Sequence, residues 1–154
     1  MIDLHCHLLP NLDDGSKSWK ESLQMVEMAY EDGIDGAVTT PHWIQGTNWQ
    51  PDPENVRVLV SELNERIRDI NIPFTVYPGM EIGITADLPG LAASGGVLSL
   101  AEGRYMLIEV PMHTLPYGIE HVVAGVKSIG KVPVLAHPER NRELQSQPKR
   151  ILSM

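Results

Sequence analysis

The sequence predicts a single α/β domain in which short parallel strands alternate with helices. Short runs rich in β-branched and apolar residues recur along the chain, and stretches with a helical spacing of apolar residues separate them. Strands that alternate with helices pair in parallel through helical crossovers, so this order predicts a parallel sheet or barrel. A length of 154 residues suits one domain with a sizeable core, and we expect one domain over residues 1–154.

Five strands are expected, each short and apolar, at residues 2–4, 37–40, 74–77, 105–110 and 131–136. A helix is expected over residues 19–31, because Ser18 and Glu21 have the spacing that satisfies free amides at a helix start. A second helix begins at Asp52 and carries apolar residues at helical spacing as far as Ile67. Weaker helical patterns lie near Leu91, over 117–129 and over 141–154, and residues 44–52 are expected to form a polar rim loop.

Composition and charge exclude several classes of function. Twenty Asp and Glu against twelve Lys and Arg give a net charge of -8, which argues against non-specific binding to nucleic acid or anionic membranes. No apolar run is long enough to span a bilayer and no signal peptide is present, so we expect a cytoplasmic protein without membrane insertion. The single cysteine, Cys6, lacks the arginine six positions later that a cysteine phosphatase needs, since that position is Leu12. We expect Cys6 to be a small buried residue.

Residues able to bind a metal ion follow each expected strand: His5 and His7, His42, Glu81, Glu109 and His137. Because the carboxyl ends of parallel strands meet at one rim, we expect these side chains to converge. Imidazoles with carboxylates and no well-placed thiolate suit manganese, iron, zinc or a mixture, with several ions bridged by carboxylate. Clusters of this kind hydrolyse phosphate esters, because one ion lowers the pKa of a water while its neighbours neutralise the phosphate oxygens.

Several motifs together resemble the PHP (polymerase and histidinol phosphatase) superfamily. The matching segments are Asp3-x-His5-x-His7, Thr40-Pro41-His42, Gly79-x-Glu81, Glu109-x-Pro111 and Ala136-His137-Pro138-Glu139-Arg140. The longer first motif, with Asp13-Asp14-Gly15, is similar to the bacterial manganese-dependent protein-tyrosine phosphatases of capsule and exopolysaccharide synthesis. The resemblance covers essentially the whole chain.

The resemblance implies a distorted TIM-like (β/α)7 PHP barrel, here incomplete, with about five parallel strands, helices outside and up to three metal ions. The ions are Mn2+, with Fe, Zn or Mg as alternatives. The implied ligands fall into three groups: His5 and His7 at the first ion, Glu109 and His137 at the second, and Asp14 with His42 at the third. Glu81 would bridge the first ion to the second. Arg140 would clamp the substrate phosphate, and Glu81 and His42 are implied to act in catalysis beside it.

The implied reaction is hydrolysis of phosphotyrosine on a partner protein, a bacterial tyrosine autokinase of polysaccharide synthesis, by metal-activated water. The alternatives are a small-molecule phosphomonoesterase, such as one resembling histidinol phosphatase, and an inactive truncated interaction module. The family pattern continues with a further Asp-x-His pair and a second arginine, which residues 1–154 do not contain. We therefore expect a domain that lacks the C-terminal part of the barrel, either truncated or completed by another chain, for example in a homo-oligomer.

Three further residues near the expected rim have open roles. Asp13 is expected to be a turn or capping residue beside the ligand Asp14, although the two could be exchanged. Trp43 and Trp49 either form an aromatic wall for a phosphotyrosine ring or pack in the interior.

Overall fold

The computed structural model describes residues 1–153 and confirms a parallel α/β fold. Every strand pair is parallel, and the strands form a three-stranded sheet in the order β1-β2-β4 and a four-stranded sheet in the order β3-β5-β6-β7. The strands within the described range are β1 (Ile2–Cys6), β2 (Gly36–Thr39), β3 (His42–Trp43), β4 (Thr75–Pro78), β5 (Glu81–Gly83), β6 (Tyr105–Glu109) and β7 (Val132–Ala136).

The very short strands β3 and β5 were not expected from the sequence. Strands β2 and β4 end within a residue of the predicted positions. After each of them, two residues interrupt the pairing, and a second short strand then follows, β3 after β2 and β5 after β4. Pro41 lies in the first interruption and has no amide hydrogen to donate. Gly79 lies in the second, where a Cβ atom would stand 2.8 Å from Val38 Cγ1. The consequence for the site is that His42 and Glu81 become register partners on adjacent strands.

The helices are close to the predicted ones: α1 (Trp19–Glu31), α2 (Pro53–Asp69), α3 (Leu88–Ala93), α4 (Ile119–Ser128) and α5 (Arg142–Ser146). Both predicted helix starts are confirmed, because Ser18 accepts a hydrogen bond from the Glu21 amide and Asp52 accepts from the Glu54 amide. The helix expected over 141–154 is shorter, since α5 is followed by a 3-10 turn over Pro148–Ser153. The last predicted position, Met154, lies outside the described residues.

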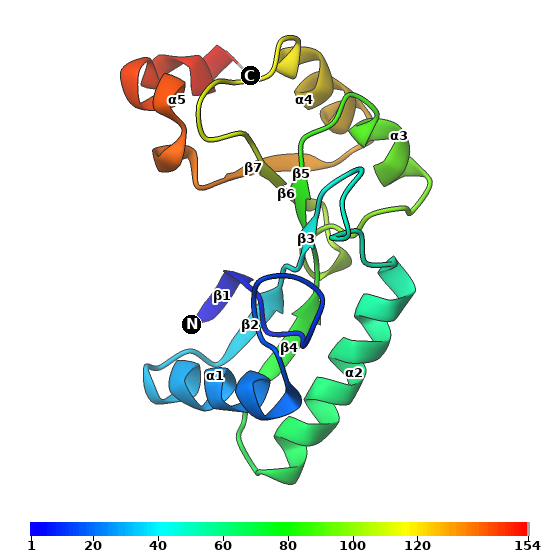
Figure 1. The fold of residues 1–154 in the computed structure, drawn as a ribbon, viewed down its shortest axis with the longest axis vertical. Coiled ribbons are helices and arrows are strands. Elements are labelled where there is room, and N and C mark those ends of the chain that lie inside the picture. Colours follow the sequence, from blue (N-terminus) through cyan, green and yellow to red (C-terminus); the bar gives the residue numbers. More distant parts are fainter. Residues whose placement is uncertain (154) are drawn as a thin grey trace.

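Helices α1 and α2 lie beside the β1-β2-β4 sheet, and α3, α4 and α5 lie toward the other sheet (Figure 1). The α2 residues Val56, Leu63 and Ile67 are fully buried in the main core. From the same helix, Asn64 donates to the Val76 carbonyl at 2.8 Å and accepts from the Val76 amide at 2.9 Å. This side chain therefore pairs with β4 as a neighbouring strand would.

Strands β1 and β7 each pair along one edge only within residues 1–153. Ile2 and Leu4 on β1 are 48% and 56% exposed, and Val134 on β7 is 37% exposed. The two sheets thus form a parallel wall that is open between β1 and β7 over the part of the chain described. Among these same residues, no helix combines the length and apolar character needed to cross a membrane.

Candidate metal centre

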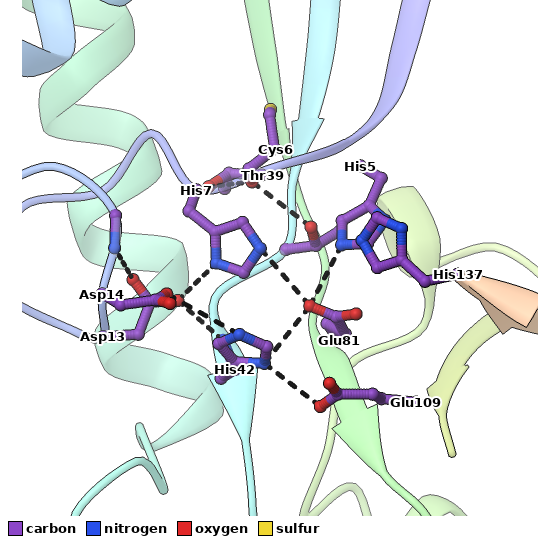
Figure 2. A network of polar contacts seen from close by, with 12 residues as sticks. His5, Cys6, His7, Asp13, Asp14, Thr39, His42, Glu81, Glu109 and His137 are labelled. Carbon is purple, nitrogen blue, oxygen red and sulfur yellow. Dashed lines mark hydrogen bonds and ion pairs between the residues drawn. The ribbon is translucent and has the colours of Figure 1, made fainter. Parts of the chain in front are cut away.

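Three histidines converge on one buried carboxylate oxygen (Figure 2). Glu81 Oε2 lies 3.0 Å from His5 Nε2, 3.3 Å from His7 Nε2 and 3.2 Å from His42 Nδ1. The Glu81 side chain is only 1% exposed. The expected convergence of His5 and His7 agrees with this geometry, since residues two apart in a strand point to the same side and both rings reach the same oxygen.

The chain after β1 folds back tightly on His7. A Cβ atom on Gly15 would stand 2.4 Å from His7 Cβ and 2.5 Å from the His7 carbonyl oxygen, so only glycine permits this approach. The Ser16 amide donates to the same carbonyl at 3.2 Å. This turn returns the Asp13-Asp14 pair to the neighbourhood of the histidines.

Asp13 orients two of these histidine residues. Its Oδ2 accepts hydrogen bonds from His7 Nδ1 at 2.6 Å and from the His42 amide at 2.8 Å, while its Oδ1 accepts from the Gly15 amide at 2.9 Å. Since His7 Nδ1 donates to Asp13, His7 Nε2 is left free to face Glu81, as in carboxylate–histidine–metal arrangements. The sequence suggested a turn or capping role for Asp13, or an exchange of roles with the expected ligand Asp14, and the doubled acidic residue before Gly15 was the available signal for another function.

The described residues contain three groups whose candidate ligand atoms lie within 4.8 Å of one another: His5, His7 and Glu81; His7, Asp14 and His42; His42, Glu81 and Glu109. Asp14 has a 63% exposed side chain with Oδ1 3.7 Å from His42 Nε2, and Glu109 Oε2 lies 3.4 Å from His42 Nδ1. Six of the seven expected ligands therefore belong to these groups.

The seventh expected ligand, His137, lies beside the cluster. Its ring centroid is 4.7 Å from that of His5, and its Nδ1 is 3.3 Å from Glu139 Oε1. The backbone of His137 has a φ of 44°, in the left-handed region that a non-glycine residue rarely adopts. Such strained conformations cluster at functional sites, and this one lies at the carboxyl end of β7.

The charges of the cluster favour cations. Burial alone would raise the pKa of Glu81, but the nearby His5 and His7 lower it to about 2. Burial alone would lower the pKa of His7, but hydrogen bonds and charge from Asp13 and Glu81 raise it to about 9. The pKa of His42 is raised chiefly by Glu109. An environment that holds positive charge on imidazoles this strongly also suits a metal ion.

One oxygen of the Glu81 side chain is available to bind such an ion. Its Oε1 atom is buried and has no hydrogen-bond partner among the described residues. A buried carboxylate oxygen without a partner is costly and calls for a specific explanation. A cation held by this oxygen and the surrounding imidazole nitrogens would satisfy it.

A cleft of about 580 Å³ opens over the cluster and contains both charged and apolar side chains. Arg140, Ile44, Met112 and Trp49 line it together with the expected ligands other than His5. Trp49 stacks on His42, with ring centroids 5.2 Å apart and planes inclined by 10°. Trp43, in contrast, is buried in the core, so of the two tryptophans left open by the sequence only Trp49 borders the cleft.

Cys6 also borders the cleft, but its thiol is not activated. Its Sγ lies 3.4 Å from the Val38 carbonyl oxygen, to which it donates. Burial, and secondarily the charge of Asp3, raise the pKa of the Cys6 thiol above its usual range. The neutral thiol is a poor nucleophile, in agreement with the expectation from the sequence.

Parallel strands whose carboxyl ends gather histidines and carboxylates define a protein of the PHP type. The chain belongs to the family described as capsular polysaccharide synthesis, CpsB/CapC, which it matches over residues 1–154. It is similar to the tyrosine-protein phosphatase YwqE of Bacillus subtilis, with 38% identity over 148 residues, covering 96% of this chain and 58% of that protein. It is also similar to the putative tyrosine-protein phosphatase CapC of Staphylococcus aureus, with 31% identity, covering 94% of this chain and 56% of that protein.

A solved structure supports the same relationship. A chain from a crystallographic study of YwqE from Bacillus subtilis and CpsB from Streptococcus pneumoniae, described as metal-dependent tyrosine phosphatases, matches with a TM-score of 0.93 and 38% identity. The match covers 98% of this chain and 61% of that chain. The family expected from the sequence is therefore confirmed, while the chain spans about 60% of the length of the relatives it matches.

Proposed function

We propose that this chain forms a metal-dependent phosphatase that hydrolyses phosphotyrosine on a protein substrate. The observation that carries the proposal is the convergence of three imidazoles on Glu81 Oε2, in the same cleft as Arg140. The relatives named as tyrosine-protein phosphatases support the choice of reaction.

The ions that we propose are manganese ions, up to three, with iron, zinc or magnesium as alternatives. The residues that would hold them are His5 and His7 for the first, Glu81, Glu109 and His137 for the second, and Asp14 and His42 for the third. Glu81 is suited to a position between two ions, because one of its oxygens faces three histidines and the other has no partner among residues 1–153. When bound, such ions supply an activated water and neutralise charge on the phosphate.

The remaining side chains of the cleft bind and orient the substrate. Arg140 is more than half exposed at the cleft and presents a planar guanidinium that matches the oxygens of a phosphate group. Ile44, Met112 and Trp49 provide apolar surface for a phenol ring. Cys6 takes no part, because its thiol stays protonated and is hydrogen-bonded to a backbone carbonyl.

The substrate that we propose is a tyrosine-phosphorylated protein, and within a family of capsular polysaccharide synthesis it would be the tyrosine kinase of that process. A small phosphomonoester is the alternative substrate. The two are separated by comparing kcat/KM for phosphotyrosine peptides with kcat/KM for histidinol phosphate and for p-nitrophenyl phosphate. A preference for the small esters would overturn the protein substrate but not the metal-dependent reaction.

The reaction is tested with two variants of the chain. Glu81→Gln removes the central carboxylate charge and is expected to abolish both manganese binding and hydrolysis, whereas Cys6→Ser is expected to leave hydrolysis unchanged. Metal content per chain after gel filtration, together with release of phosphate from a phosphotyrosine peptide, gives the two readouts. Hydrolysis that depends on Cys6, or that persists without bound metal, would contradict the proposal, and a chain that binds no metal would indicate an inactive interaction module.

A further inference from the structure

The segment directly after β3 is a compact loop held by its own hydrogen bonds. The Ile44 amide donates to the Trp49 carbonyl at 2.6 Å, which closes the loop at its base. Inside the loop, the Thr47 hydroxyl donates to the Ile44 carbonyl at 2.8 Å and accepts from the Trp49 amide at 3.0 Å. These contacts fix the backbone at both ends of the loop, and Trp49 is thereby brought back toward the strand from which the loop leaves.

A further contact joins this loop to the neighbouring strand. The Thr85 hydroxyl donates to Gln45 Oε1 at 2.6 Å, and Thr85 lies two residues beyond the end of β5. The loop is therefore anchored on β3 and on the segment beyond β5. Both strands carry candidate ligands, since β3 begins with His42 and β5 begins with Glu81.

The two nitrogen atoms of the His42 ring face different groups. Nδ1 lies 3.2 Å from Glu81 Oε2 and 3.4 Å from Glu109 Oε2, whereas Nε2 lies 3.7 Å from Asp14 Oδ1. A rotation of the ring about its bond to Cβ would change the distances from both nitrogens to these carboxylate oxygens. The orientation of this ring thus decides whether His42 can serve a metal ion at all.

Trp49 covers one face of that ring. The two rings are nearly parallel, with a centroid separation of 5.2 Å and an angle of 10° between planes. A flat contact of this kind resists rotation of the imidazole while leaving its edge, which carries both nitrogens, free. Among the described residues, the other ring in contact with His42 is that of His7, and its plane is tilted by 49°.

We propose that Trp49 is a positioning residue of the metal centre, which fixes the ring of His42 so that each nitrogen faces its own set of ligands. This inference rests on the proposed function, because it assigns the residue that maintains one of the proposed ligands. It assigns a role to the loop over residues 44–49 that goes beyond lining the cleft. Trp49 acts through His42 and needs no contact with a metal ion or with the reacting phosphate.

A titration of the metal-free chain with Mn2+ tests this role. Trp49→Ala is expected to weaken manganese binding about fivefold, the loss that corresponds to one aromatic contact, and Trp49→Phe is expected to stay within about twofold of the natural chain. The matched control is Trp19→Ala, because Trp19 is also half-buried and in ring contact with a side chain, Arg66, but lies on α1 away from the cleft. Thermal unfolding establishes that each variant is folded, and Trp49→Leu replaces the alanine variant if that one is not.

A double-mutant cycle then decides whether the effect passes through His42. In a His42→Ala background, Trp49→Ala is expected to cause no further loss of manganese affinity, whereas in a His5→Ala background the fivefold loss is retained. The visible absorption of the Co2+-loaded chain gives an independent signature, expected to change with Trp49→Ala and to be restored by Trp49→Phe.

The outcomes separate this inference from the proposed function. Unchanged manganese affinity in Trp49→Ala, or an undiminished loss in the His42→Ala background, would overturn the positioning role while leaving the metal centre intact. If the natural chain bound no manganese, the metal centre and the role of Trp49 would both be wrong. If it bound manganese normally but did not hydrolyse phosphotyrosine, only the proposed reaction would fail.

Discussion

Replacing Asp13 with Asn removes one negative charge from the candidate metal centre and changes almost nothing in the shape of the side chain. Asp13 accepts three hydrogen bonds through two oxygens, from His7 Nδ1, the His42 amide and the Gly15 amide. An amide side chain offers one acceptor oxygen only, and its NH2 group must then face at least one of these N–H donors. The substitution therefore breaks at least one charge-assisted hydrogen bond in a buried place.

The size of the effect follows from the contacts that are lost. A hydrogen bond to a charged group contributes about 1.5–3 kcal/mol. For a chain of this size, that loss lowers the melting temperature of the metal-free protein by about 3–12 °C. The same substitution replaces the carboxylate that holds His7 with a neutral group, and loss of such a supporting carboxylate weakens metal binding by about 10- to 100-fold. This affinity loss equals about 1.4–2.8 kcal/mol, so the two magnitudes agree.

Calorimetric titration with Mn2+ and thermal unfolding of the metal-free protein measure both effects. Asp14→Asn is the matched control, because the Asp14 side chain is 63% exposed and its only described contact, to His42 Nε2, is 3.7 Å long. This control is expected to lower the number of bound ions while changing the free energy of unfolding by less than about 0.5 kcal/mol. If Asp13→Asn bound manganese normally, or if Asp14→Asn were the destabilised variant, the assignment of Asp13 as the orienting residue would be refuted.

Three further predictions concern the turn, the core and protonation. Gly15→Ala forces a Cβ atom to within 2.5 Å of His7, so this variant is expected to lose about 1–3 kcal/mol of stability and to bind manganese more weakly. Gly96→Ala is the control in the same unfolding and binding assays, because its Cβ atom meets no atom closer than 3.4 Å. Asn64→Ala removes both hydrogen bonds to Val76 and is expected to lower the free energy of unfolding in urea by about 1–3 kcal/mol, with unchanged metal binding. If the free energy of unfolding fell by less than about 0.5 kcal/mol, this pairing would not stabilise β4. Asp13 and Glu81 raise the pKa of His7 to about 9 despite its burial, so His7 is protonated at pH 7 in the absence of metal. Manganese uptake is therefore expected to release close to one proton and to become tighter as the pH rises toward about 9. Calorimetric titrations in buffers of different ionisation enthalpy measure this proton release.

The fold class and the gathering of most candidate ligands at one rim could be predicted because both depend on local signals. Helix starts are encoded within a few residues, as at Ser18 and Asp52, and strands alternate with helices in a regular order. Parallel topology then places the carboxyl ends of all strands at one rim. A residue that directly follows a strand, such as Glu81 or Glu109, can therefore be assigned to this rim without knowledge of its contacts.

The features that were missed depend on contacts between distant residues. Strands β3 and β5 contain two and three residues, which is too short for any alternation to be detected, and they exist because His42 and Glu81 pair with each other. The contacts of Asp13 and Trp49 with His42 are equally dependent on the folded chain. Asp13 reaches the amide of His42, 29 positions away, and Trp49 reaches its ring only because the loop folds back.

The candidate metal centre lies where the two sheets meet, and this has a consequence for stability. His5 belongs to β1 of the three-stranded sheet, whereas His42, Glu81 and Glu109 belong to strands of the four-stranded sheet. Ions held by residues from both sheets would therefore join them, in addition to the link that Asp13 makes to the His42 amide. Because such ions bind the folded chain and not the unfolded one, a free concentration of 100 times Kd would stabilise the fold by about 2.7 kcal/mol. The cost of the buried Glu81 oxygen that has no hydrogen-bond partner among the described residues would thus be offset by the binding for which these residues are suited.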